Sequence, residues 1–484
     1  MKMNSVIYRL HLLLFLIISI NCRLEEGNIL LPMTSNFTLD HYHNKVYNKN
    51  YYTIPLLVGT PEEEYEVQVD TSSATTWIPS SHCKNCILAH RLYDPEDSRT
   101  SSPTDISVKL EDEDGNVEGY QIADNIKLGS YKLKQYGFVE VTRVADNFKD
   151  HYQGKLGLGY KSVHLQDDEF NFLEKLKRHN LIKKKIFTLN AINNKKGMLF
   201  IGDVPGKEYN TYCNITDTDE LDDMYKESWV CKMTHVGIFD TEKGIFNKIK
   251  YYDEIKYNKL VNFDSAYDFI GVPISEKENI EKLIKKANLK CETRENNAKE
   301  KMPQDIKLQK LKNRIRDEEV SILCETNIEE IRMKAIALSF VLQGYVYSLP
   351  LDLLFINSHE NGKMEMLIRY IDDDDAIWTF GYPFMNQFLT IFNMEDGHVG
   401  LKKLKKTALP IVNLYKDWEH WYLRKEGLES AGKIVGIIVL ILVVIVLAFL
   451  VYRYIRRRTL EKNGPAIDTG NNEDNDKDNK NKVY

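Results

Sequence analysis

Apolar and polar residues alternate along much of the chain, which is the pattern of half-buried β-strands. Residues 65–69 (YEVQV) show this alternation, and residues 51–61 form a similar stretch that ends in a Gly-Thr-Pro turn. Helical periodicity is less common, and we expect helices at 172–182 and 276–287. The pattern predicts a mostly β protein with a few short helices.

Two uninterrupted apolar runs depart from this alternation. Residues 10–20 follow Lys2 and Arg9 and are too short to span a membrane, so residues 1–22 are interpreted as a signal peptide, with a signal anchor as the alternative. Residues 434–452 contain no charge, and 19 residues in a helix are long enough to cross a hydrocarbon core of about 30 Å.

The charges after the second run predict its orientation. Four arginines follow it, at positions 453, 456, 457 and 458, and basic residues favour the cytosolic side of a membrane. We therefore expect a single-pass type I membrane protein. Most of the chain would then lie in a secretory or vacuolar lumen or at the cell surface.

Composition limits the classes of function. A chain of 484 residues with 43% hydrophobic residues can fold into two or three lobes with substantial cores. The formal net charge of −6 argues against nucleic acid as a partner. The tail at 453–484 is rich in Asn, Asp and Lys and is expected to be disordered.

The expected export of the chain determines how its cysteines and glycosylation sequons are interpreted. Apart from Cys22 there are six cysteines, an even number that favours disulfides in an oxidising compartment, although six cysteines allow fifteen pairings. Proximity along the chain favours the pairs Cys83–Cys86, Cys213–Cys231 and Cys291–Cys324. The Cys-x-x-Cys pair at 83–86 also occurs in zinc and redox sites, but no second Cys pair or His cluster in the sequence supports a metal site. Asn36 and Asn214 begin N-glycosylation sequons.

Two related turns carry the candidate chemistry. Residues 69–79 (VDTSSATTWIP) and 262–273 (NFDSAYDFIGVP) each place an Asp after an apolar run, then a small hydroxyl residue, and a Pro nine positions after the Asp. A duplicated Asp-hydroxyl turn is what a two-lobed enzyme with a pair of carboxylates needs. The chain resembles the pepsin family of aspartic peptidases on these motifs.

The resemblance extends along most of the chain and implies its organisation. It implies a mostly β, two-lobed fold with an active-site cleft between the lobes. The expected divisions are a signal peptide (1–22), a short N-terminal segment (23–50), an N-lobe (51–205), a C-lobe (206–404) with a charged insertion (292–319), a stem (405–433), the transmembrane helix (434–452) and the cytosolic tail (453–484).

The resemblance also assigns roles in the site. Asp70 and Asp264 would be the catalytic carboxylates, which share one proton, activate a water against a peptide bond and need no metal or cofactor. Thr71 and Ser265 would brace the two turns through their hydroxyls, and Ser73 would hydrogen-bond the first Asp. The substrate would be a polypeptide.

The chain departs from the family pattern at several of these positions. Ser72 and Ala266 replace the glycine of each Asp turn, which requires a negative φ there. Tyr267 replaces a small hydroxyl residue that supports the second Asp, and Asp268 adds a charge nearby.

Further departures fall in the flap and beneath the dyad. Asp112, followed by Glu113, stands where the family has the flap tyrosine. Lys155 and Tyr382 stand where the family has an apolar residue and usually an Asp. Two functions follow: a membrane-anchored aspartic endopeptidase, or a catalytically inactive pepsin-like binding or adhesion module on a membrane anchor. The retained Asp pair favours the first, and the substitutions favour the second.

Overall fold

A computed structural model describes residues 27–42, 45–83, 85–86, 91–112, 115–145, 153–161, 170–193, 196–204, 209, 211–217, 221, 225–251, 259–295, 320–358, 362–371, 377–404, 409, 411–413, 450–451 and 453. Two compact units are present, Met1–Asn413 and Leu414–Tyr484, and the fold below is that of the first. The signal peptide expected at 1–22 and nearly all of the run 434–452 lie outside the described residues. No described helix has the length and apolar character needed to cross a bilayer.

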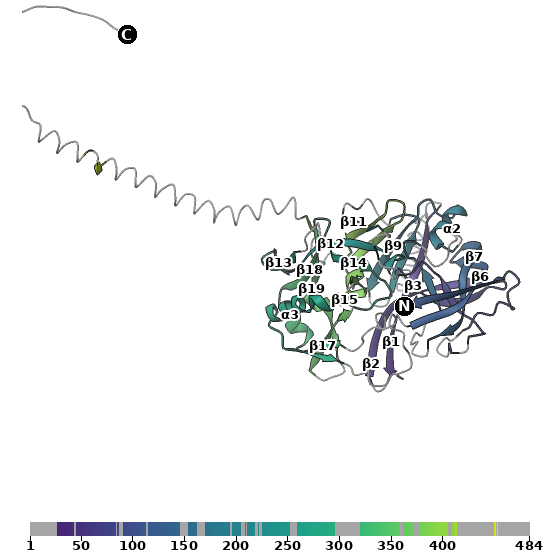
Figure 1. The fold of residues 1–484 in the computed structure, drawn as a ribbon, viewed down its shortest axis with the longest axis horizontal. Coiled ribbons are helices and arrows are strands. Elements are labelled where there is room, and N and C mark those ends of the chain that lie inside the picture. The colour runs from purple at the N-terminus through teal and green to yellow at the C-terminus, as the bar shows by residue number, and fades with distance from the viewer. Residues whose placement is uncertain are drawn as a thin grey trace, which may run out of the picture. The chain divides into compact units, whose positions relative to one another are not determined.

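The first unit is mostly β, as the alternating pattern predicts (Figure 1). The strands up to the middle of the chain are β1 (Ile29–Tyr42), β2 (Lys45–Val58), β3 (Glu63–Asp70), β4 (Trp77–Pro79), β5 (Ser102–Asp112), β6 (Gly115–Leu128), β7 (Tyr131–Val144), β8 (Lys155–Gly157), β9 (Ile186–Asn193), β10 (Lys196–Ile201) and β11 (Tyr212–Asn214). The later strands are β12 (Val230–Asp240), β13 (Ile245–Tyr251), β14 (Lys259–Phe263), β15 (Ile270–Pro273), β16 (Cys291–Glu295), β17 (Val320–Glu325), β18 (Ile336–Leu342), β19 (Tyr345–Pro350), β20 (Phe355–Asn357), β21 (Lys363–Met366), β22 (Ile368–Ile371), β23 (Trp378–Phe380), β24 (Phe388–Asn393), β25 (His398–Lys403) and β26 (Val412–Asn413).

The described helices are short. They are α2 (Phe172–Arg178), α3 (Lys277–Lys286), α4 (Ile328–Arg332) and α5 (Tyr382–Met385), with 3-10 turns η3 (Ile274–Glu276) and η6 (Leu351–Leu354). Helix α2 is shorter than the stretch 172–182 expected from the sequence. It ends at Arg178 because Asn180 adopts a left-handed φ of 55°, which turns the chain away from the helix axis.

A thirteen-stranded sheet contains strands from both halves of the chain. Its order is β11-β25-β24-β9-β10-β1-β2-β3-β8-β4-β7-β6-β5. Strands β9 and β10 come from the first half, and β24 and β25 come from the end of the second half. The two halves therefore share one continuous set of backbone hydrogen bonds, and they cannot separate without breaking the pairing of β9 with β24.

Each half also contains the same small strand arrangement around its Asp turn. In the first half, β3 leads into the turn and pairs in parallel with β8, so that Asp70 lies opposite Gly157. In the second half, β14 leads into the turn and pairs in parallel with β23, so that Phe263 lies opposite Phe380. The duplication inferred from the two motifs is thus present in the strand pairing.

Two glycines allow the backbone to pack closely beneath these turns. A Cβ on Gly157 would lie 2.5 Å from the backbone of Ala74, and a Cβ on Gly381 would lie 2.0 Å from the carbonyl oxygen of Tyr267. Both distances are far below van der Waals contact. Glycine is required at these positions by space, since neither residue has a positive φ.

Trp229 fills the junction between the halves. It is fully buried, and its indole N–H donates to the carbonyl oxygen of Leu158 at 2.8 Å. Its ring lies 5.0 Å from Tyr160, 5.7 Å from Phe187 and 5.0 Å from Phe392 between centroids. These partners come from both halves of the chain, so one side chain links the loop after β8 to the sheet that the halves share.

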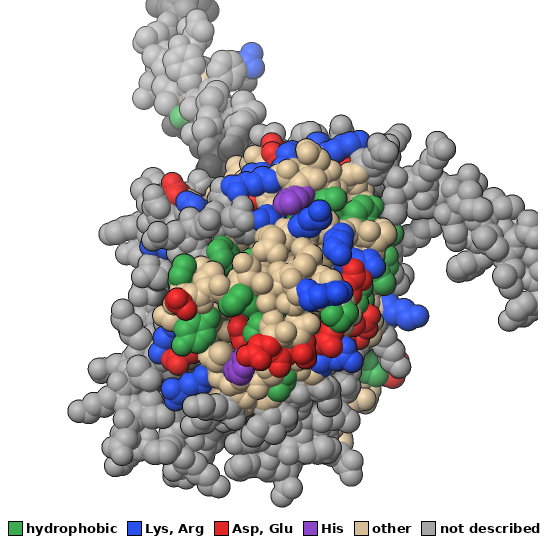
Figure 2. Space-filling view, turned by 90° about the vertical axis from the view of Figure 1, so that its right-hand side faces the viewer, with side chains coloured by type: hydrophobic (Ala, Val, Ile, Leu, Met, Phe, Trp, Pro, Cys, Tyr) green, Lys and Arg blue, Asp and Glu red, His purple; other side chains and the backbone are tan. Residues whose placement is uncertain are grey.

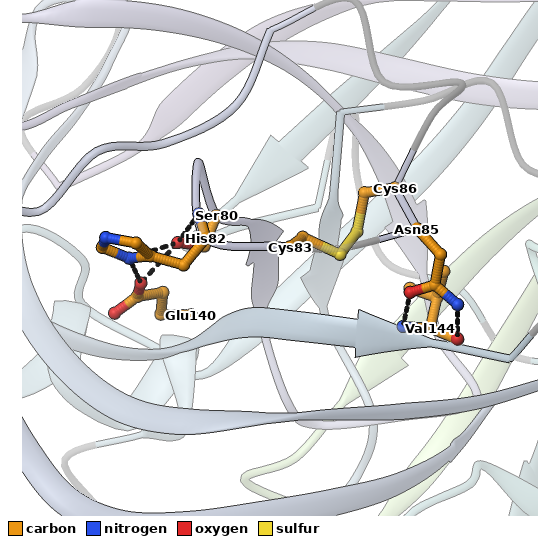
Figure 3. The surroundings of a disulfide bond; sticks show 7 residues. All are labelled: Ser80, His82, Cys83, Asn85, Cys86, Glu140 and Val144. Carbon is orange, nitrogen blue, oxygen red and sulfur yellow. Dashed lines mark hydrogen bonds and ion pairs between the residues drawn. A yellow bond between two sulfur atoms is a disulfide. The ribbon is translucent and has the colours of Figure 1, made fainter.

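The loop after the first Asp turn is held by a disulfide and by hydrogen bonds on both sides of it (Figure 3). Cys83 and Cys86 form the disulfide. The amide of Asn85 donates to the carbonyl oxygen of Val144 at 2.6 Å and accepts from its N–H at 3.2 Å. On the other side, Ser80 donates to the buried carboxylate of Glu140. The loop is therefore fixed to β7 at two points.

The other two cysteine pairs are joined as expected from their proximity in the sequence. Cys213 is bonded to Cys231, and Cys291 is bonded to Cys324 across the β16–β17 pair. Three disulfides confirm the expected pairing. The loop at 83–86 is thus a disulfide loop and not a zinc site.

One face of the molecule is mixed in charge. On the face drawn in Figure 2, basic and acidic side chains lie among uncharged side chains, backbone and scattered apolar groups. The large exposed apolar side chains of the described part lie on different elements, for example Ile106 on β5, Tyr120 on β6 and Met333 after α4.

The junction role of Trp229 gives a testable prediction. Trp229→Ala is expected to lower the free energy of unfolding by about 3–5 kcal/mol, because it removes a large buried ring and its packing. Trp229→Phe keeps most of the packing but leaves the Leu158 carbonyl without its donor, and should cost about 1–3 kcal/mol. Chemical denaturation measures both. Tyr120→Ala, at a side chain that is 46% exposed, is the matched control, and equal losses for Trp229→Ala and this control would contradict the assignment.

Candidate active site

Asp70 ends strand β3 with its carboxylate buried. The side-chain oxygen Oδ1 accepts two hydrogen bonds from Ser72, one from its backbone N–H at 2.7 Å and one from its hydroxyl at 2.7 Å. The serine that replaces the family glycine therefore adds a donor to the carboxylate. Hydrogen bonds to a charged acceptor favour its ionised form and fix its orientation.

Asp264 follows β14 in the corresponding position of the second half. It is 4% exposed, and its Oδ1 accepts the backbone N–H of Ala266 at 2.8 Å. Neither Ser72 nor Ala266 has a positive φ, as their side chains require. Both turns thus keep the backbone N–H two residues after the Asp as a donor to the carboxylate.

Reciprocal hydrogen bonds join the two turns. The backbone N–H of Thr71 donates to Ser265 Oγ at 3.1 Å, and the N–H of Ser265 donates to Thr71 Oγ1 at 2.9 Å. Each hydroxyl also donates across to the other strand, Thr71 to the carbonyl oxygen of Phe263 at 2.8 Å and Ser265 to that of Val69 at 2.7 Å. These four bonds form the cross-brace expected from the sequence. They hold the turns of Asp70 and Asp264 against each other, although the two residues lie far apart in the sequence.

Ser73 does not have the role expected from the resemblance. Its hydroxyl donates to Glu227 Oε2 at 2.9 Å, and the hydroxyl that reaches Asp70 belongs to Ser72. The same Glu227 oxygen also accepts the N–H of Ala74 at 2.9 Å. With a serine at both positions, the nearer hydroxyl meets the Asp70 carboxylate, and the next one is left to bind the neighbouring buried acid.

Glu227 is a contributor that the sequence analysis missed. It is buried, and its carbonyl oxygen also accepts the N–H of Tyr160 at 2.6 Å. The adjacent Ser228 donates to the carbonyl oxygen of Ser72 at 3.0 Å. The segment before β12 thus holds the first Asp turn through these hydrogen bonds. A Glu-Ser pair before a strand carries no distinctive sequence signal, so only the tertiary structure reveals it.

Lys155 makes the main unexpected contact of the site. Its ammonium lies 3.3 Å from Asp70 Oδ2, and both side chains are only 2% exposed. Lys155 is the first residue of β8, and it lies opposite Gln68 of the neighbouring strand β3. The sequence shows a lysine where the family has an apolar residue, but it does not indicate that the lysine side chain reaches the Asp70 carboxylate.

Tyr267, Asp268 and Tyr382 lie around the second turn. The N–H of Tyr382 donates to the carbonyl oxygen of Tyr267 at 2.7 Å, and all three side chains are buried. Burial raises the pKa of Tyr382 to about 12, and the nearby Asp268 carboxylate adds to the rise. The Tyr382 phenol is therefore neutral and can act as a hydrogen-bonding group at physiological pH. Its ring lies 5.9 Å from that of Tyr52.

The flap is a hairpin of β5 and β6. Asp112 pairs with Gly115 at its tip, while Glu113 lies outside the described residues. Trp77 packs in a small apolar cluster with residues of β5, β6 and β7, among them Leu110, which lies opposite Val117 two residues from the tip. The hairpin is thus packed against Trp77 close to its tip, where it carries an acidic residue.

Other candidate positions are placed as follows. Asn214 lies exposed in β11, and Asn36 lies in β1. The described residues contain no group of three or more His, Cys, Asp or Glu side chains that could hold a metal ion.

Several curated proteins match parts of the chain. It is 30% identical to pregnancy-associated glycoprotein 1 of Sus scrofa over 184 residues, which are 37% of this chain and 46% of that protein. It is 28% identical to cyprosin of Cynara cardunculus over 198 residues, which are 39% of this chain and 40% of that protein. Both matches span less than half of the relative. A longer match covers 71% of this chain and 78% of pepsin II-2/3 of Oryctolagus cuniculus, at 20% identity.

The family comparison covers more of the chain than any of these pairs. The profile described as eukaryotic aspartyl protease matches residues 51–404, a range that includes both Asp turns, the flap hairpin and the strands that the two halves share. Together with the duplicated turns and their cross-brace, this match shows that the chain belongs to the eukaryotic aspartyl protease family.

Proposed function

We propose that this chain is a membrane-anchored aspartic endopeptidase in which Asp70 and Asp264 activate water for the hydrolysis of peptide bonds. The observation that carries the proposal is the cross-brace of Thr71 and Ser265. It brings the two Asp turns together, and each turn supplies a backbone N–H to its carboxylate. Members of a peptidase family act on polypeptides, so a polypeptide is the proposed substrate class.

The proposed reaction requires one proton on the pair of carboxylates. Two carboxylates at close range do not both ionise easily, so one is ionised and the other is protonated. The carboxylate accepts a proton from water as the water oxygen bonds to the carbonyl carbon. The carboxylic acid donates its proton to the carbonyl oxygen, which gives a gem-diol intermediate. As the C–N bond breaks, the acid that took a proton from water gives it to the leaving nitrogen, and the other carboxylate takes a proton back from a hydroxyl of the gem-diol. The products are a carboxylic acid and an amine, and the dyad again carries one proton.

A second function is favoured by a specific observation at the flap. The hairpin carries Asp112 near its tip, opposite Gly115, in place of the aromatic residue that covers the substrate in the family. A flap without that aromatic group excludes water less well, and exclusion of water strengthens the electrostatics of a closed site. A pepsin-like module that binds ligands without cleaving them is therefore the alternative.

Membrane anchoring is part of the proposal. Its support is the uncharged run at 434–452 and the arginines that follow it. The peptidase unit would then lie on the side of the membrane opposite to the tail, in a secretory or vacuolar lumen or at the cell surface.

The anchored topology predicts glycosylation of the peptidase unit. Asn214 is exposed and begins a sequon, so the full chain expressed in a eukaryotic secretory system should carry a glycan there. Glycosidase treatment should lower the apparent mass of the wild-type chain on gel electrophoresis. Asn214→Gln should remove the part of this decrease that the Asn214 glycan causes. Asn125, which is not in a sequon, gives the control substitution Asn125→Gln. A chain that shows no glycosidase-sensitive mass with Asn36 and Asn214 intact would contradict the lumenal placement.

The dyad assignment predicts the loss of activity in two variants. Asp70→Asn and Asp264→Asn keep the shape of each side chain but remove the acid, so each should lower kcat/KM for peptide cleavage by at least about 10²-fold. The measurement uses the purified full chain in mild detergent with a peptide library between about pH 4 and 7. An inhibitor of aspartic peptidases should suppress the wild-type rate.

The matched control is Asp97→Asn, at an exposed acid outside the site. It should leave the rate unchanged. If the wild type cleaves no peptide at any pH, or if the Asn variants cleave as fast as the wild type, the hydrolase proposal fails and the binding module is favoured.

The cross-brace predicts a coupled loss of stability and activity. Thr71→Val removes the acceptor of the Ser265 N–H and the donor to the Phe263 carbonyl, two buried backbone groups. We expect a loss of unfolding free energy of about 1–3 kcal/mol, since an unpaired buried polar group keeps its desolvation penalty. Activity should fall as well, because the spacing of the two turns loosens.

Thr71→Ser retains the hydroxyl and is the matched control. It should keep most of the stability and activity, as measured by thermal unfolding and by kcat/KM. Equal behaviour of Thr71→Val and Thr71→Ser would show that the hydroxyl does not brace the turns.

A further inference from the structure

We propose that Lys155 is a positioning residue of the dyad, whose ammonium pairs with the Asp70 carboxylate and adds a positive charge to the buried pair of acids. This inference rests on the proposed function. The ammonium lies 3.3 Å from Asp70 Oδ2, and the two side chains are each 2% exposed. At that distance and burial the attraction between the charges is screened much less than at a protein surface.

The contacts of Asp70 divide between its two oxygens. Oδ1 accepts the N–H and the hydroxyl of Ser72, and Oδ2 faces Lys155. All three groups are donors, and a donor or a positive charge favours a carboxylate over a carboxylic acid. The Ala266 N–H is the donor to Asp264 that corresponds to the Ser72 N–H in the first turn. The described geometry therefore places a backbone N–H, a hydroxyl and an ammonium at the Asp70 carboxylate.

The strand pairing shows that the lysine breaks the symmetry of the two halves. Lys155 lies two residues before Gly157 on β8, and Thr379 lies two residues before Gly381 at the corresponding place on β23. Thr379 is buried and uncharged. The fold thus accommodates a neutral residue at this position in one half and a lysine in the other.

Stability alone gives a weak reason for a lysine here. Removing two charges from water costs free energy that their attraction only partly returns, and apolar residues of similar volume often serve as well or better. The effect of the ammonium on the charge of Asp70 is the more direct consequence.

Other ionisable groups surround this pair and belong to its electrostatics. The acids on the elements packed around β3 and β8 are Asp264 and Asp268 after β14, Glu140 on β7 and Glu227 before β12. Glu140 binds Ser80 and His82, and Glu227 binds Ser73. Apart from the dyad itself, the other three acids add negative charge to the surroundings of the ammonium.

The proposal has a direct consequence for the pH dependence of the reaction. The reaction needs one proton on the dyad, and a nearby positive charge makes that proton easier to lose. Removing the charge should let the dyad keep its proton to higher pH. Both limbs of the plot of kcat/KM against pH should therefore move upward when Lys155 becomes neutral.

The test compares Lys155→Met with Lys155→Arg in the full chain in mild detergent. Lys155→Met keeps most of the length of the side chain without its charge, and its profile should shift upward by roughly one to three pH units. Lys155→Arg keeps the charge, and its profile should stay near that of the wild type. Lys175→Met removes another buried lysine, on α2, and is the control for a loss of charge elsewhere. A Lys155→Met profile that is unchanged or moves downward would overturn the proposal.

A second measurement needs no substrate. Thermal unfolding of Lys155→Met, Asp70→Asn and the double variant forms a double-mutant cycle. If the ammonium and the carboxylate are paired, the melting temperature of the double variant should fall by less than the sum of the decreases in the two single variants. Additive losses would overturn the ion pair and with it the proposal.

The two measurements separate failure of this inference from failure of the proposed function. A chain without cleavage at any pH but with a non-additive cycle would overturn the catalytic role of both Asp70 and Lys155 and leave a structural ion pair. A chain that cleaves peptides, with an unchanged Lys155→Met profile, would overturn only the role of Lys155.

Discussion

The structure of the site depends on four hydrogen bonds that cross between Thr71 and Ser265 and their neighbouring strands. All four are buried, where an unpaired polar group is costly, so each hydroxyl requires the opposite strand end in place. This requirement fixes the positions of the two loops before any substrate is present. The flap, the disulfide loop and the shared sheet belong to the same fold as this pair of turns, whose separation the four bonds set.

The two halves tolerate different chemistry around this common centre. In the first half, Ser72 adds a hydroxyl to the carboxylate, and Lys155 adds an ammonium. In the second half, the corresponding positions are Ala266 and Thr379, which carry no charge. The backbone pattern is duplicated, but the electrostatic environment is not. Such a difference is compatible with the division of labour between a base and an acid that the hydrolysis of a peptide bond requires.

The fold could be predicted from the sequence because its signals are local or repeated. Alternating strands, two Asp turns and neighbouring cysteines each leave a pattern within a short stretch. The cross-brace of Thr71 and Ser265 could be expected from the two related turns, but the other contacts of the site join distant segments and leave no pattern in the sequence. Ser72 and Ser73 are adjacent hydroxyl residues, and only the backbone direction decides which one meets Asp70 and which meets Glu227. The long stem of Lys155 can reach in several directions, and its partner is set by the packing of β8 against β3.

The hairpin of β16 and β17 has a consequence of its own. Its strands remain paired from Cys291 with Cys324 to Glu295 with Val320, and the disulfide locks the first of these pairs. Glu295 and Val320, the two ends of this hairpin, therefore lie next to each other. Because the disulfide and the strand pairing hold the two ends side by side, the segment between them is suited to the genetic insertion of a fluorescent reporter or an affinity tag.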